Sequence, residues 1–141
     1  MTSEKFEFER FLADVTRRVQ GPRWSPNTDV FVDEDGGRVI VKVELAEADL
    51  ERLHVGVDER YLFIVGRRTD GTRFTRGSFL QKEIEYGDFV KKLRLPVSVD
   101  YQHATASYRD GMLTIRLPVS HSSTLPRHRT EIPMTVTRIP V

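Results

Sequence analysis

The sequence contains no cysteine among its 141 residues. Without thiols there is no disulfide framework, no thiolate nucleophile and no cysteine-ligated metal. The chain also lacks an apolar run near the roughly 18 residues that a membrane helix needs. Its first residues show no basic segment followed by an apolar stretch. We therefore expect a chain without a membrane span that works in the reducing cytoplasm.

An excess of one charge sign is missing as well. The chain carries 22 Lys and Arg against 21 Asp and Glu, a formal net charge of +1, and the two signs are interleaved along its length. Proteins that bind nucleic acid by displacing counterions usually concentrate basic residues on one face. A nucleic-acid partner is therefore not expected.

Residues typical of catalytic and metal sites are few and scattered. The four histidines are scattered, at His54, His103, His121 and His128, and none forms an H-x-x-x-H pair. No nucleophile elbow and no phosphate-binding glycine loop is present. The acidic stretch 33–36 is similar to the start of a calcium loop, but the later ligand positions hold Val39 and Val41, so a hairpin turn is expected. These patterns predict neither an enzyme nor a cofactor or metal site.

Residues 1–23 form a candidate helical arm. Apolar side chains recur there at helical spacing, since Phe8, Leu12 and Val15 fall at i, i+4 and i+7. The side chains expected to make its contacts are Phe8, Phe11, Leu12 and Val15. A lone helix this short is marginal in water. The arm must therefore pack either on its own domain or on other copies and client proteins.

Residues 24–118 consist of short runs that alternate between apolar and polar side chains. The runs 38–45 and 53–57 each place their apolar residues on one face of an extended chain. The run 61–65 is apolar on both faces, as a central strand would be. Turn residues such as Asp110-Gly111 separate the runs. This pattern predicts an all-β domain built as an antiparallel sandwich.

Residues 119–141 differ in composition from the region before them. Ser, Thr, Pro and Arg dominate as far as residue 138, and such a segment buries too little apolar surface to offset its chain entropy. We therefore expect a flexible C-terminal extension. It ends on Ile139, Pro140 and Val141, whose two β-branched side chains point the same way in an extended chain and need an apolar partner.

Four segments resemble motifs of the alpha-crystallin family of small heat-shock proteins. Residues 106–113 resemble its A-x-x-x-N-G-V-L signature, with Asp for Asn and Met for Val. The signature positions are Ala106, Asp110, Gly111 and Leu113. Residues 24–30 and 86–96 are similar to the W-x-P-x-x-D-φ and Y-G-x-F-x-R-x-F-x-L-P segments of bacterial members, and residues 139–141 to the I-x-I/V anchor. Together they cover the chain in the family's order of arm, domain, tail and anchor.

The resemblance implies an immunoglobulin-like sandwich that forms dimers by exchanging a strand. The loop 69–87 would carry this strand to the partner's sheet, although an ordinary hairpin within one subunit is the alternative. Interface residues implied by the family are Phe79, Leu80, Ile84 and Lys91. Lys91 stands where the family usually has Arg, so it either pairs at the interface without a bidentate fork or extends to solvent at a sheet edge. Arg67 and Arg68 are expected to be solvated loop charges or contacts across the dimer.

The resemblance also implies a groove between two strands that takes the C-terminal anchor of another copy. The expected groove residues are Leu53, Val55, Val57, His103 and Thr105. The expected anchor residues are Ile139 and Val141, and the segment 132–134 (Ile-Pro-Met) is a second candidate anchor. Many such weak attachments would hold a higher oligomer together by avidity.

The function implied is that of an ATP-independent holdase, a chaperone that binds unfolding clients and prevents their aggregation. Clients would later pass to ATP-dependent chaperones. The alternative is a co-chaperone or adaptor with the related CS-domain sandwich, which binds a folded partner. Such proteins lack both the turn signature and the C-terminal anchor.

Overall fold

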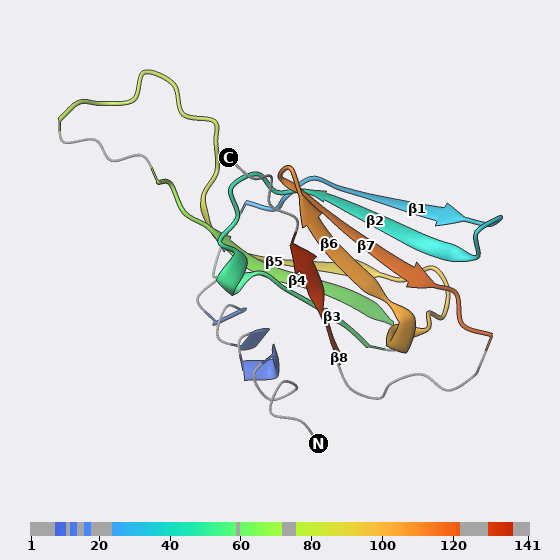
Figure 1. Cartoon of the computed structure of the whole chain (residues 1–141). Helices are drawn as coiled ribbons and strands as arrows, with labels where there is room; N and C mark the ends of the chain where they lie inside the picture. Colours follow the sequence, from blue (N-terminus) through green and yellow to red (C-terminus); the bar gives the residue numbers. More distant parts are fainter. Residues whose placement is uncertain are drawn as a thin grey trace.

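A computed structural model of the chain describes residues 8–10, 12–13, 16–17, 24–58, 60–71, 76–121 and 130–136. In this part of the chain, nine strands form two sheets that face each other (Figure 1). The first sheet has the order β1-β2-β7-β6-β9, with β1 Thr28–Asp33, β2 Arg38–Glu44, β7 Met112–Pro118, β6 Thr105–Arg109 and β9 Met134–Val136. The second has the order β5-β4-β3-β8, with β5 Gly87–Arg94, β4 Tyr61–Arg68, β3 His54–Val57 and β8 Thr130–Ile132. The predicted all-β sandwich is confirmed.

Neighbouring strands are antiparallel except for β6 and β9, which run parallel. Two 3-10 turns, η1 Leu50–Arg52 and η2 Tyr101–His103, link strands, and the described residues of the N-terminal arm are helical. No helix in the described residues is long and apolar enough to cross a membrane.

Side chains from both sheets meet in one apolar core. In β2 the valines at 39, 41 and 43 are buried while their neighbours are not, as the alternation predicts. Strand β4 lies between β5 and β3, and its run 62–66 is buried throughout, as expected for a central strand. Phe89 is fully buried and packs edge-on to Trp24, with ring centroids 5.0 Å apart.

The hairpin between β6 and β7 has the turn that Asp110 and Gly111 predict. Both residues have positive φ, 52° and 77°, and the strands pair directly on either side of the turn. A β-carbon added at Gly111 would lie 3.2 Å from the Cα of Ala46. The glycine therefore serves both the backbone conformation and a close approach between segments.

Gly111→Ala is expected to lower the free energy of unfolding by about 1–2 kcal/mol, since an L side chain is strained at positive φ. Gly37→Ala is the matched control, because Gly37 has φ 63° but no atom within 4 Å of an added β-carbon. Chemical denaturation should show the larger loss for Gly111→Ala. Equal losses would mean that crowding against Ala46 has no effect.

Residues 130–136 differ from the expected extended tail, because they form β8 and β9. Segment 130–132 pairs with β3 and segment 134–136 with β6, so the chain crosses from one sheet to the other at Pro133. Proline has no N–H to donate and suits a position between two strands. These residues pair because β3 and β6 each offer an edge, and because Ile132 supplies an apolar side chain for the core.

Residues 76–86 project away from the sandwich as an irregular loop (Figure 1). The segment 79–84 has no strand partner among the described residues, so its exchange with the sheet of another copy stays a prediction. We call residues 76–86 the projecting loop.

Candidate functional site

The first candidate surface is the groove between β3 and β6, which the chain's own tail segment fills. Val55 faces Ile132 in the β3–β8 register, and Ala106 faces Met134 in the β6–β9 register. Ile132 is only 3% exposed and belongs to the main core cluster. We call this surface the tail groove.

Of the five residues predicted to line this groove, three are buried beside the tail segment and two are exposed. Leu53, Val55 and Val57 are buried, whereas His103 and Thr105 lie at the surface. The Nδ1 atom of His103 lies 2.6 Å from Oδ2 of Asp100, in the turn before β6. Inward positions on β6 are instead Ala106 and Tyr108, because side chains alternate along a strand. The Tyr108 hydroxyl donates to the carbonyl oxygen of Leu45 at 2.7 Å.

A polar contact closes the outer edge of the tail groove. His54 on β3 and Glu131 on β8 are hydrogen-bonded through Nδ1 and Oε1, and both side chains are partly exposed. The segment 132–134, predicted as a second anchor, is thus the one that occupies the groove. The predicted terminal anchor, Ile139 and Val141, lies outside the described residues.

The second candidate surface is the outer face of the sheet β5-β4-β3-β8, which the N-terminal arm covers. Phe8 is 1% exposed and Leu12 is 5% exposed, and both cluster with Phe63 and Val65 of β4. This arrangement matches the alternative in which the arm packs on its own domain. The other two predicted arm contacts, Phe11 and Val15, lie outside the described residues.

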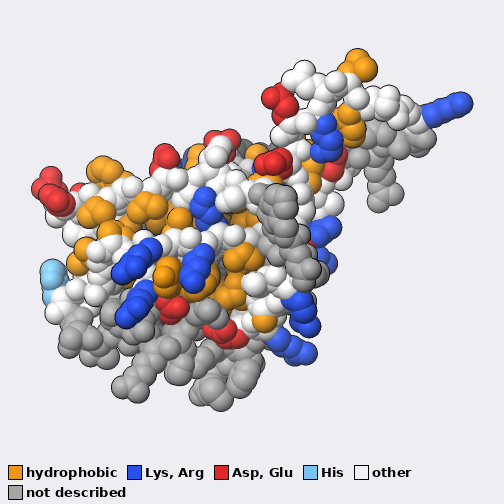
Figure 2. All heavy atoms as spheres, turned by 180° about the vertical axis from the view of Figure 1, so that it is seen from behind, with side chains coloured by type: hydrophobic (Ala, Val, Ile, Leu, Met, Phe, Trp, Pro, Cys, Tyr) orange, Lys and Arg blue, Asp and Glu red, His pale blue; other side chains and the backbone are white. Residues whose placement is uncertain are grey.

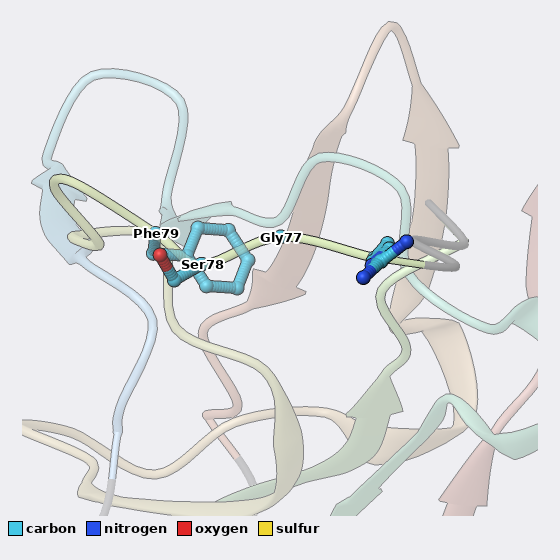
Figure 3. Close-up of a pocket in the computed structure, with 4 residues that line it drawn as sticks. Gly77, Ser78 and Phe79 are labelled. Atoms are coloured by element: carbon cyan, nitrogen blue, oxygen red, sulfur yellow. The ribbon is translucent and has the colours of Figure 1, made fainter.

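The third candidate surface is the projecting loop, whose apolar side chains face solvent. Leu80 is 102% exposed, Ile84 is 61% exposed and Phe79 is 56% exposed. Hydrophobic side chains are visible on this protrusion in Figure 2. A hollow of about 220 Å³ is lined by residues 76–79, with the Phe79 ring beside Ser78 (Figure 3). These three apolar residues are the loop positions predicted for the dimer interface.

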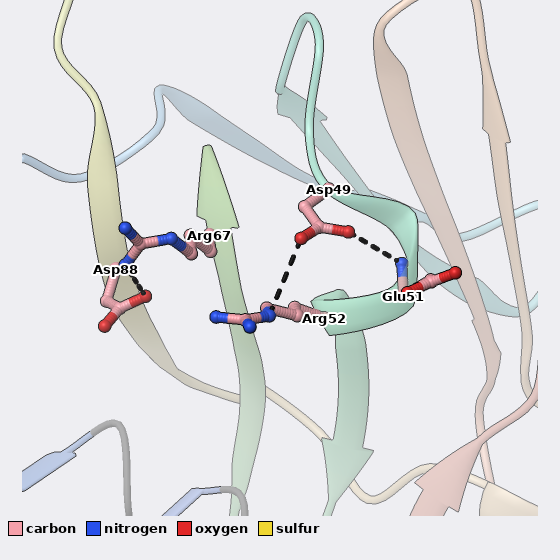
Figure 4. A network of polar contacts seen from close by, with 5 residues as sticks. All are labelled: Asp49, Glu51, Arg52, Arg67 and Asp88. Atoms are coloured by element: carbon pink, nitrogen blue, oxygen red, sulfur yellow. Dashed lines mark hydrogen bonds and ion pairs between the residues drawn. The ribbon is translucent and has the colours of Figure 1, made fainter. Parts of the chain in front are cut away.

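Two arginines fix the base of this loop, contrary to the expectation of solvated charges. Arg67 donates to Oδ1 of Asp88 at 2.9 Å, linking β4 to β5 (Figure 4). The guanidinium of Arg68 lies 4.4 Å from the ring centroid of Trp24 and donates to the Glu85 carbonyl oxygen at 2.5 and 2.9 Å. Both contacts lie within the chain, and a role of these arginines across a dimer stays a prediction. Both were missed because the sequence does not show that Trp24 and residues 85–88 meet at the end of β4.

A second ion pair lies beside the first in Figure 4, at the turn η1. Asp49 accepts from the backbone N–H of Glu51 at 3.2 Å, and its other oxygen lies 3.6 Å from Nε of Arg52. The aspartate therefore caps the short helix whose first N–H groups lack intrahelical partners.

Lys91 lies on edge strand β5 and reaches the segment before β1. Its ammonium donates to Oγ of Ser25 at 3.2 Å and to the Pro26 carbonyl oxygen at 3.3 Å. The side chain is half-buried, with its stem on the inward side of the strand. The ammonium therefore bonds within its own chain, and a role of Lys91 at a dimer interface stays a prediction.

No group of three or more His, Asp and Glu side chains in the described residues is arranged to hold a metal ion. The acidic stretch 33–36 forms a turn, in which Oδ1 of Asp33 accepts from the N–H of Gly36 at 2.9 Å. The hairpin expected there is confirmed.

Comparison of structures places this sandwich among the alpha-crystallin domains of small heat-shock proteins. Heat shock protein 16.0 from Schizosaccharomyces pombe superposes with a TM-score of 0.63 at 28% identity, over 74% of this chain and 80% of that chain. A small heat-shock protein from Xylella fastidiosa gives a TM-score of 0.61 at 27% identity, over 85% of this chain and 98% of that one.

Sequence comparison defines the family. A model of the Hsp20/alpha crystallin family matches residues 31–135. Small heat shock protein C4 of Rickettsia felis is 31% identical over 99 residues, 70% of this chain but only 60% of that protein. Alpha-crystallin of Mycobacterium tuberculosis is 32% identical over 65% of this chain and 62% of its own length. The chain belongs to the Hsp20/alpha crystallin family and spans about three fifths of the length of these two relatives.

Proposed function

We propose that the chain is an ATP-independent holdase that binds partly unfolded proteins without chemical catalysis. The observation that supports this most directly is that short terminal segments cover two apolar surfaces of the domain. The arm covers the outer face through Phe8 and Leu12, and the tail segment covers its groove through Ile132. A holdase needs apolar surface that can be hidden and exposed again.

The free energy that holds the arm on the sheet is small enough for the arm to be released and bound again. Burial of Phe8 and Leu12 contributes about 3–6 kcal/mol, whereas ordering the backbone of each arm residue costs about 1–2 kcal/mol. The burial of these two side chains therefore offsets the ordering of only a few arm residues, so the arm is held weakly. Opening of the arm is therefore thermally accessible, and client binding shifts the balance toward the open form.

Self-association through the projecting loop is the second part of the proposal. Strand β1 is the outer strand of its sheet, and it exposes Val30 (45%), Phe31 (62%) and Val32 (40%). The loop of one copy exposes Leu80 and Ile84 and has no strand partner among the described residues, so it suits addition to an edge strand of another copy. The terminal Ile139 and Val141 would link such dimers into larger assemblies. Clients held there would pass to ATP-dependent chaperones.

The alternative of a CS-domain co-chaperone is not favoured. The matched family model extends over residues 31–135, including the Asp110-Gly111 turn and the tail segment. A co-chaperone of that type is expected to lack the turn signature and the terminal anchor of Ile139 and Val141. The proposal therefore concerns unfolding clients rather than a folded partner.

A direct test is light scattering of a heat-labile client, such as citrate synthase, with the purified chain and no ATP. We expect aggregation to be suppressed near equimolar ratios of chain to client. Serum albumin at the same mass serves as the control for non-specific protection. Absence of suppression up to a large excess of the chain contradicts the holdase proposal.

A further inference from the structure

We propose that the outer face of the sheet β5-β4-β3-β8 is a docking site for amphipathic helical segments of clients. The site would take an aromatic and an aliphatic side chain one helical turn apart, and the arm is its resident occupant. This inference rests on the proposed holdase function and names the class of client segment that one surface binds.

The centre of the site is a seat for one aromatic ring above Gly56. A β-carbon added at Gly56 would lie 2.2 Å from Cζ and 2.3 Å from Cε1 of Phe8, and its three nearest atoms all belong to that ring. Phe8 is 1% exposed. The missing side chain on β3 is therefore what lets an aromatic ring lie flush with the sheet.

Neighbouring strands complete the floor of the seat. Gly56 faces Phe63 on β4, and Phe63 faces Lys92 on β5, so these three residues form one cross-strand row. Val65 and Val90 face each other in the adjacent row, and Val65 is fully buried beneath the arm. An apolar floor on the outside of a sheet is unusual for a strand face that meets water.

Charged groups mark both ends of the floor. On the β5 side, the ammonium of Lys92 lies 4.1 Å from the ring centroid of Tyr61 and 5.9 Å from that of Phe63. On the β8 side, Glu131 faces Gly56 in register and bonds to His54. An apolar strip between polar ends suits a helix that is apolar on one side only.

The arm fills this face incompletely. A cleft of about 590 Å³ remains between arm and sheet, lined among others by Leu12, Ala13, Phe63, Val90 and Lys92. Ala13 contributes only a methyl group there. A client helix with a larger side chain at the corresponding position would bury more apolar surface than the arm does. Such a segment can therefore compete with the arm although the arm is tethered.

Two substitutions separate release of the arm from loss of the site. Phe8→Ala empties the seat and leaves its floor unchanged. Adding Gly56→Ala to Phe8→Ala fills the seat with a methyl group, and Gly56 has no positive φ that would strain alanine. Gly71→Ala in the Phe8→Ala background is the matched control, because no atom lies within 4 Å of its added β-carbon. Thermal unfolding of the full-length variants should show all of them folded.

The probe is a fluorescein-labelled peptide with the sequence of residues 4–19, followed by fluorescence anisotropy. We expect Phe8→Ala to bind it roughly tenfold or more tightly than the unsubstituted chain, because the competing arm no longer holds the site. Phe8→Ala with Gly71→Ala should bind equally well. Phe8→Ala with Gly56→Ala should lose at least tenfold in affinity, and so should a peptide carrying Ala at position 8. Equal binding to the Gly56→Ala double variant overturns the site.

Citrate synthase held at its unfolding temperature then tests the class of occupant. It should displace the labelled peptide from Phe8→Ala. Peptide binding without displacement would mean that the face takes only arms of other copies, which overturns the client assignment. Suppression of aggregation by the variants separates the two proposals. If Phe8→Ala with Gly56→Ala suppresses aggregation to the same degree as Phe8→Ala alone, and the unsubstituted chain is active, the docking site is refuted while the holdase proposal stands. If the unsubstituted chain gives no suppression, the holdase proposal fails.

Discussion

Replacing Leu80 and Ile84 together by Asp is expected to convert dimers into monomers, with a dissociation constant raised on the order of 100-fold or more. Two apolar side chains would be lost from the proposed contact with strand β1, and two charges would be placed there without partners. Leu80 is 102% exposed and Ile84 is 61% exposed. The fold of the single chain should therefore be unaffected. Analytical ultracentrifugation across a concentration series measures the change.

Val97→Asp provides the control for this experiment. Val97 is also an exposed apolar residue, at 39%, but it lies after β5 and outside the projecting loop. Its replacement should leave the dimer unchanged. If Leu80 and Ile84 can be replaced without dissociation, the loop is an ordinary connection within one subunit, as the alternative reading of residues 69–87 holds.

Ile132→Asp is expected to release the tail segment and to shift the chain toward larger assemblies. A charge at this position is incompatible with the core, since Ile132 is 3% exposed among apolar neighbours. The groove would then be open to the terminal Ile139 and Val141 of other copies, which we propose as the assembly anchor. One groove holds one apolar segment, so the internal segment limits the terminal one by competition.

Native mass spectrometry of two further variants tests this competition. Deleting residues 139–141 from the Ile132→Asp chain should return the assemblies to dimers, because the groove is then open but no anchor remains. Deleting the same residues from the unsubstituted chain should also leave dimers. Large assemblies that persist after the deletion would show that some other segment links the copies. Hydrogen exchange at β3 and β6 should rise in Ile132→Asp, which verifies that the tail segment has left.

Elements with a clear periodic pattern were predictable from the sequence. Alternation identified β2 and β3, the two-sided apolar run identified β4 as a central strand, and Asp110-Gly111 predicted the β6–β7 turn. Each of these features depends on local residue spacing. The alternation of apolar side chains and the residue types at turns are therefore sufficient to locate these strands and this turn in the sequence.

Features that depend on distant partners could not be predicted in the same way. Segments 130–132 and 134–136 are too short for a periodic signal, and they become strands only because β3 and β6 leave edges nearby. On β6 the sequence interpretation chose Thr105 as a groove residue, whereas Ala106 is the residue that points inward. A shift by one residue along a strand moves the side chain to the opposite face of the sheet. The seat for Phe8 was missed because a glycine in a strand does not reveal what lies above it.

The outward-facing edge of β1 has a thermodynamic consequence for the isolated chain. In the proposed dimer, the exposed Val30, Phe31 and Val32 gain burial from the other copy, so folding and association would be linked by mass action. A tenfold rise in protein concentration should therefore raise the melting temperature, and dilution should lower it. The melting temperature then depends on the protein concentration as well as on the sequence. A cell that makes more of the chain under stress would also make each copy harder to unfold.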